Sequence, residues 1–151
     1  MDLFRRAPAT AILIAVNVVI FAYTLLTPSG MSLYANGTLV PADLMSGGPW
    51  WTLLTSMFLH GSIPHILCNM VSLYSLGEGI ESLYGTVRFL IIYFVSGILG
   101  GLAYVLLSPI TGNPLVGCVG ASGAIFGLFG AEGFLMLKER KGYVRSVDVA
   151  N

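Results

Sequence analysis

The sequence contains few charged residues. Asp, Glu, Lys and Arg together make up 9% of the 151 residues, against roughly a quarter in average soluble proteins. Seven basic residues balance seven acidic ones, so no net charge attracts nucleic acid or acidic substrates. In contrast, 56% of the residues are hydrophobic and the mean hydropathy is +0.85. These values exclude an ordinary soluble domain and place the chain in the lipid bilayer, where its partners must be sought.

Cysteine is also scarce. Cys68 and Cys118 both lie in apolar runs, which favours small buried thiols over a disulfide framework. The chain shows no paired carboxylates and no three-ligand pattern typical of zinc sites. We therefore expect neither a metal nor an organic cofactor.

Four apolar runs are long enough, at about twenty residues each, to cross a hydrocarbon core of roughly 30 Å. We place these spans near residues 9–27, 62–82, 86–108 and 115–137. The first run follows two arginines, so a cleaved signal peptide is an alternative. Its length and the lack of a small-residue cleavage pattern favour a retained span. The fold expected is therefore all-α, a polytopic membrane helix bundle with a long loop after its first helix.

The basic residues predict the orientation of this bundle, because Lys and Arg near the ends of spans stay on the cytoplasmic side. They precede the first run, separate the second from the third, or follow the fourth: Arg5, Arg6, Arg88, Lys138, Arg140, Lys141 and Arg145. We therefore expect a multi-pass protein of the cell membrane with both ends cytoplasmic and residues 28–60 outside. Trp50 and Trp51 in this outer loop indicate either an interfacial helix with an aromatic anchor or a working loop at the membrane face.

Three polar residues are expected at one depth near the outer surface. His65 and Asn69 are four residues apart, so they share one face of the second helix. Both lie one to two turns below the outer surface at a rise of about 1.5 Å per residue. Ser122 lies at similar depth, because the fourth run also enters from outside. The topology thus predicts that an imidazole, an amide and a hydroxyl can meet.

Each of these residues also has a purely structural interpretation. A serine in a membrane helix commonly bonds to its own backbone, and a histidine or asparagine commonly bonds to a neighbouring helix. Small residues form packing stripes of the G-x-x-x-G kind at Gly123, Gly127 and Ala131, and at Gly97 and Gly101. Gly120 fits no such stripe. It indicates a helix start where the backbone approaches another group closely and free N–H groups point at an incoming oxygen.

Several motifs, taken in order, resemble those of the rhomboid intramembrane serine proteases. They are "HGSIPHILCN" at 60–69, "GEGIESLYG" at 77–85 and "GASG" at 120–123, together with the tryptophan-rich outer loop. The resemblance covers nearly the whole chain. It implies that Ser122 is the catalytic nucleophile, and that His65, Asn69 and the N–H of Ser122 form the oxyanion hole. It also implies supporting roles for Gly120, Gly123, His60 as a structural residue of the loop, and Phe126, against which a catalytic histidine packs.

The resemblance further implies acyl transfer to transmembrane protein substrates near the outer membrane face. A serine needs a base to take its proton, and rhomboids use a histidine from a sixth helix that does not occur here. His65 is a poor substitute, because donating to an oxyanion and accepting a proton place opposite demands on one imidazole. We therefore expect one domain, residues 1–151, truncated at its C-terminus and complemented by a further segment.

Two other classes of protein remain possible from the sequence. A rhomboid-like pseudoprotease would bind membrane-protein clients without cleaving them, and the lack of the base favours it. Retention of Ser122, His65 and Asn69 speaks against it. A transporter or channel subunit would carry polar groups through the full depth of several spans, whereas these cluster at the outer end.

Overall fold

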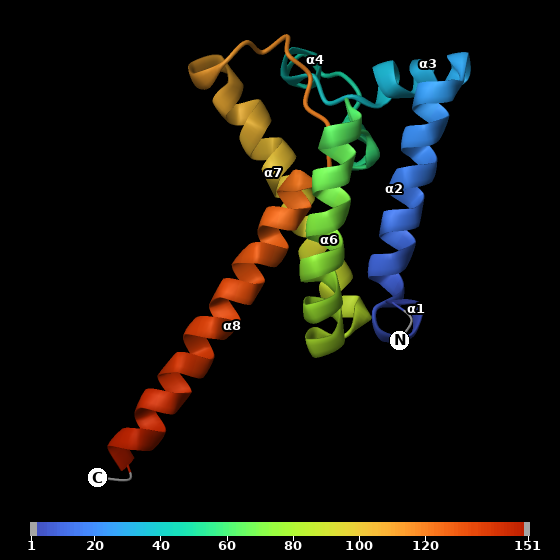
Figure 1. Cartoon of the computed structure of the whole chain (residues 1–151). Helices are drawn as coiled ribbons and strands as arrows, with labels where there is room; N and C mark the ends of the chain where they lie inside the picture. Colours follow the sequence, from blue (N-terminus) through green and yellow to red (C-terminus); the bar gives the residue numbers. More distant parts are fainter. Residues whose placement is uncertain (1–2, 150–151) are drawn as a thin grey trace.

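The computed structural model describes the backbone of residues 3–149 and the side chains of residues 3–138. Its helices are α1 (Leu3–Arg6), α2 (Pro8–Leu26), α3 (Pro28–Gly37), α4 (Pro41–Met45), α5 (Thr52–Thr55), the 3₁₀ helix η1 (Ser56–Phe58), α6 (Ile63–Tyr84), α7 (Thr86–Thr111) and α8 (Ser122–Val149). Figure 1 shows the four long helices as a bundle, with α3 and α4 at one end and both chain termini toward the other.

The four long helices form an all-α membrane bundle, with the short helices of the long loop between the first two. By length and composition, α2 and α7 are apolar enough to cross a membrane. The other two are more polar, since α6 carries Glu78 and Glu81 and α8 continues into the charged stretch after residue 137. The sequence explains where α6 begins and ends. Ser62 caps its first turn by accepting from the N–H of His65, and Gly85, with φ of 82°, separates it from α7.

The fourth long helix begins at Ser122, later than the start near 115 that hydropathy predicts. The preceding segment pairs instead with the outer loop. The N–H of Cys118 donates to the carbonyl of Leu39 at 2.8 Å, and the N–H of Leu39 donates back at 3.2 Å. Gly120 then takes φ of 120°, a conformation that is unfavourable for residues with a side chain. An apolar composition could not reveal this pairing, and its result is that Ser122 is the first residue of α8.

Glycines of the predicted stripes form the contact between α7 and α8, except Gly101, which faces Leu39 and Leu53. A methyl group built on Gly123 would lie 3.6 Å from the Cα atoms of both Gly97 and Gly100. One built on Gly127 would overlap the side chain of Ser96. Close approach of two backbones through small residues is a common way for membrane helices to associate. The outer half of α8 is thereby fixed to α7, while its distal half runs away from α6 (Figure 1).

This packing predicts the effect of one methyl group. Gly127→Ala forces Ser96 to move, so we expect a loss of about 1–3 kcal/mol in the free energy of unfolding, typical of overpacking. Gly130→Ala, three residues further along the same helix, meets nothing within 4 Å and is expected to be neutral or slightly stabilising. Denaturant titration of both variants in one detergent makes the comparison. Equal stability of the two variants would contradict this account of the contact.

At the opposite end of the bundle, a buried carboxylate joins α6 to the start of α2. Glu81 is only 2% exposed. One of its oxygens accepts from the N–H of Ala9 at 2.9 Å and from the hydroxyl of Thr86 at 2.8 Å. The other accepts from the N–H and the hydroxyl of Thr10, both at 2.8 Å. Glu81 therefore binds two free N–H groups in the first turn of α2, where a negative charge is favoured.

Candidate active site

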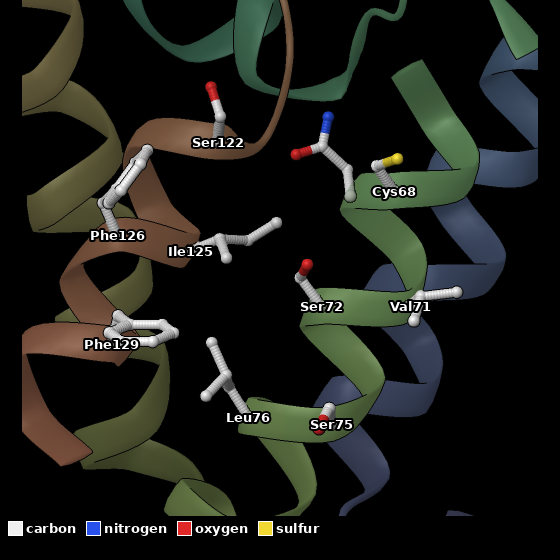
Figure 2. Close-up of a pocket in the computed structure, with 10 residues that line it drawn as sticks. Cys68, Val71, Ser72, Ser75, Leu76, Ser122, Ile125, Phe126 and Phe129 are labelled. Carbon is white, nitrogen blue, oxygen red and sulfur yellow. The ribbon is translucent and has the colours of Figure 1, made fainter. Parts of the chain in front are cut away.

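Ser122 lies exposed at the N-terminus of α8, with a hollow on either side. On one side, an open groove of about 450 Å³ separates α6 from α8 and is lined by Cys68, Asn69, Val71, Ser72, Ser75, Leu76, Ser122, Ile125, Phe126 and Phe129. Figure 2 shows Leu76 of α6 and Ile125 and Phe129 of α8 pointing toward one another across it. On the other side, a hollow of about 210 Å³ reaches the glycine face of α7. A ligand can therefore approach the hydroxyl from two directions.

Gly120 brings the backbone before Ser122 against two side chains of α6. A methyl group built on Gly120 would lie 2.6 Å from Nε2 of His65 and 3.5 Å from Nδ2 of Asn69. The N–H of Gly120 donates to the carbonyl of Ser56 at 2.8 Å, which fixes this turn to the outer loop. The structure thus places His65 and Asn69 beside the turn that leads into Ser122. Asn69 and Ser122 also line the same groove.

One long hydrogen bond within the described residues orients the ring of His65. The N–H of Gly61 donates to Nδ1 of His65 at 3.4 Å. An imidazole that accepts at Nδ1 carries its proton at Nε2 when neutral. Nε2 is the atom nearest Gly120, so this tautomer presents an N–H donor on the side of the glycine turn. The arrangement suits a residue that stabilises an anion, and it leaves no free lone pair for a base.

The first turn of α8 adds further donors. The N–H groups in the first turn of a helix lack partners within it, and they carry the positive end of the helix dipole. Ser122 is the first residue of such a turn. A developing oxyanion beside Ser122 would therefore meet backbone donors from one side and the α6 side chains from the other.

His60 lies outside this hydrogen-bonded group. Its side chain is 2% exposed, and its ring packs edge-to-face on that of His65 with centroids 5.1 Å apart. Neither ring nitrogen makes a hydrogen bond of good geometry within the described part of the chain. Burial and the neighbouring His65 lower the pKa of His60 from 6.5 to about 4, while the backbone of Phe58 partly opposes the shift. His60 is therefore neutral at physiological pH.

This lowered pKa predicts a pH dependence of stability. As the pH falls from 6.5 toward 4, the unfolded chain takes up a proton at His60 before the folded chain does. The contribution of His60 is therefore complete above pH 6.5 and is lost below it, by about 3 kcal/mol at most. We expect His60→Phe to flatten the stability profile between pH 6.5 and 4 relative to the parent. Parallel profiles for the two proteins would show that His60 does not titrate in this way.

The remaining predicted site residues line the groove or its floor. Phe126 is 77% exposed and lies one turn after Ser122 in the groove wall (Figure 2). Gly123 faces α7 and provides close packing. Cys68 is exposed in the groove, contrary to the expectation of a buried thiol. Sequence reasoning also missed Ser72 and Leu76 in the α6 wall, although their spacing of three and seven residues from Asn69 places them on one helix face.

Gly120 offers a direct test of this geometry. Gly120→Ala places a methyl group against Nε2 of His65 at a φ of 120°, which strains the turn and displaces the ring. We expect the reactivity of Ser122 to fall by about a hundredfold, the usual penalty for misplacing a catalytic group by about 1 Å. Gly112→Ala is the matched control, since that position meets nothing within 4 Å. Labelling rates with a serine-directed fluorophosphonate, measured with the complementing segment present, compare the two variants, and equal rates would contradict the geometry.

Comparison with known proteins shows to which family of proteins this chain is similar. Residues 47–148 match the family model described as the Rhomboid domain. The chain is 41% identical over 105 residues to "Rhomboid protease GluP" of Bacillus subtilis (strain 168), covering 70% of this chain and 20% of that protein. It is 38% identical over 108 residues to "RHOMBOID-like protein 4" of Arabidopsis thaliana, covering 70% and 26%. It is 39% identical over 89 residues to "Rhomboid-like protease 3" of Toxoplasma gondii, covering 59% and 32%. The chain spans 20% to 65% of the length of the first relatives it matches.

Proposed function

The chain belongs to the rhomboid family, and on this premise we propose that it is the nucleophile-bearing part of an intramembrane serine endopeptidase that cleaves transmembrane proteins near the outer membrane face. The observation that carries the proposal is the contact of Gly120 with His65 and Asn69, two residues before an exposed serine at a helix N-terminus. Relatives named as proteases support the reaction class.

The proposed reaction is acyl transfer. A substrate helix, locally unwound near the outer surface, presents a peptide carbonyl to Ser122. The Oγ of Ser122 loses its proton to a base and bonds to the carbonyl carbon, whose oxygen becomes an oxyanion. The Nε2–H of His65, the amide of Asn69 and the N–H of Ser122 stabilise this charge. The C–N bond then breaks, the amine leaves with a proton, and water hydrolyses the acyl-enzyme.

The general base is proposed to lie outside residues 1–151. The chain contains two histidines. His65 holds its acceptor nitrogen toward Gly61, and His60 is buried away from Ser122's groove. We propose that a complementing segment brings a histidine against the exposed ring of Phe126. The open groove between α6 and α8 leaves space beside Ser122 for such a segment.

Fluorophosphonate labelling tests this function. We express residues 1–151 alone and together with the part of Rhomboid protease GluP that follows its matched region. Residues 1–151 alone are expected to label at the background rate, and the combined sample at least about a hundredfold faster, the usual contribution of a general base. Mass spectrometry should place the label on Ser122. Labelling of another residue would contradict the assignment of the nucleophile.

A catalytically inactive rhomboid-like protein that binds membrane-protein clients is the second candidate. It is favoured by one observation, namely that neither histidine is placed to act as the base, because Nδ1 of His65 accepts from Gly61 and His60 is buried. This candidate predicts that Ser122 stays unlabelled with any complementing segment. The two candidates therefore give opposite results in the same experiment.

The orientation is also part of the proposal. The N-terminus and the distal end of α8 lie toward one end of the bundle, opposite α3 and α4 (Figure 1). Arg5, Arg6 and Arg88 are at this same end, before α2 and at the start of α7, and the positive-inside rule supports a cytoplasmic side for this end in the cell membrane. A membrane-impermeant thiol reagent should therefore react from outside with a cysteine introduced at Ser46. It should not react with one introduced at Ser82.

A further inference from the structure

A second pocket lies at the outer end of the bundle, away from the groove that contains Ser122. It encloses about 460 Å³ between the end of α2, α3 and the loop before α6. Phe21, Leu25 and Met31 form an apolar part, and Tyr34, His60 and Ser62 form a polar part. The pocket therefore combines an apolar part and a polar part, as the binding of an amphiphile at the membrane surface requires.

His60 contributes to this pocket a polar side chain that has no hydrogen-bond partner among the described residues. Its side chain is 2% exposed, and both ring nitrogens lack a hydrogen bond of good geometry. A buried polar atom without a partner costs about 1–3 kcal/mol, so such groups usually mark a ligand or water site. Both nitrogens are shielded from solvent although His60 lines the pocket, so a bound ligand must displace part of the surrounding loop to reach them.

The lack of charged residues around the pocket restricts the ligand. Among the residues lining the pocket there is no Asp, Glu, Lys or Arg, and residues 7–77 contain Asp43 as their one residue of these four types. A phosphate or carboxylate group would find no cation here. A neutral imidazole offers one N–H donor and one acceptor. A hydroxyl group, which both donates and accepts, is the complementary partner.

We propose that this pocket binds an uncharged glycerolipid through a glycerol hydroxyl that bonds to His60. The acyl chain lies along Phe21 and Leu25 at the outer end of α2. The pocket is separate from the groove that contains Ser122, so the Ser122→Ala chain is expected to bind the lipid equally well.

Photo-crosslinking in nanodiscs tests the proposal with the Ser122→Ala form of the whole chain. The probe is a monoacylglycerol with a diazirine in its acyl chain. We expect crosslinked peptides from residues 21–35 and 60–63. Unlabelled monoacylglycerol should compete at least about fivefold more effectively than the fatty-acid methyl ester of the same chain length, which has no hydroxyl; this is the ratio that one hydrogen bond of about 1 kcal/mol provides.

Three variants make the test specific. His60→Phe keeps the ring and removes both nitrogens, so the preference for monoacylglycerol should disappear. Ala35→Trp fills the pocket from α3 and should abolish the crosslink. Ala15→Trp, on the exposed surface of α2, is the matched control and should leave it intact. Equal competition by the methyl ester, an unchanged preference in His60→Phe, or crosslinks confined to other segments would overturn the proposal, and would show that water alone or a nonspecific apolar surface occupies this place.

Discussion

Replacing Ser122 with alanine is expected to reduce cleavage of a transmembrane substrate by at least about a thousandfold when the complementing segment is present, because no other group can form the acyl-enzyme. The Oγ of Ser122 is the one nucleophile that stands at the helix N-terminus beside Gly120, with the α6 side chains across the turn. The measurement is the rate of product formation in liposomes that contain a fluorescent single-span substrate. Substrate binding should change little, since alanine removes one oxygen atom.

Two further variants accompany Ser122→Ala, the first as a control and the second as a test of the oxyanion hole. Ser46→Ala removes another exposed hydroxyl from the outer side, at the end of α4, and should leave the rate within about twofold of the parent, as expected for a surface change away from the site. Asn69→Ala should lower the rate by about a hundredfold, the usual cost of one oxyanion donor. Residual cleavage by Ser122→Ala above one per cent of the parent would exclude Ser122 as the nucleophile.

Replacing Glu81 with alanine is expected to cost about 3 kcal/mol or more in the free energy of unfolding, because it leaves buried donors without an acceptor. The carboxylate receives four hydrogen bonds from Ala9, Thr10 and Thr86. Two of the donors are backbone N–H groups of α2 that have no partner within their helix. Equilibrium unfolding in a mixed detergent titration gives the value. The loss should appear as a separation of α2 from α6.

Matched variants separate charge from burial at this position. Glu81→Gln retains the shape but turns an NH₂ group toward two of the donors, so we expect about 2 kcal/mol of destabilisation. Glu78→Gln, one turn earlier, removes a partly exposed ion pair with Arg6 at 3.7 Å and should cost less than about 1 kcal/mol. Similar losses at both positions would show that Glu81 does not act as the cap of α2.

Hydropathy predicts where the long helices lie, but it does not predict where α8 begins, which determines the position of Ser122. The starts of α2, α6 and α7 lie within one residue of the apolar runs predicted near 9, 62 and 86. The prediction for α8 fails by seven residues, from 115 to 122. Residues 115–121 are apolar enough for a helix, but Cys118 pairs with Leu39, nearly eighty residues earlier, and no local pattern encodes that partner.

Part of the site could be predicted from the sequence, because spacing along a helix and the order of the spans place residues without knowledge of distant contacts. Helical spacing places His65 and Asn69 on one face, and topology places Ser122 at the same end. Gly120 stood out because it fitted no packing stripe, and the structure gives it the backbone conformation that glycine tolerates best. The tautomer of His65 depends on the N–H of Gly61, and the unpartnered ring of His60 depends on the surrounding loop. Neither can be derived from composition or spacing.

The tight contact between α7 and α8 restricts how proteins of this kind can diversify. A methyl group at Gly127 would overlap Ser96, and one at Gly123 would already fill the space to the α7 backbone, so selection for new clients has little freedom on that side of Ser122. The opposite wall of the groove is more permissive, because Val71 and Ser75 are exposed on α6. Sequence differences between orthologues, and the functional variants found in directed-evolution libraries, should therefore lie mainly on α6. The residues at the contact of α7 with α8 should vary little.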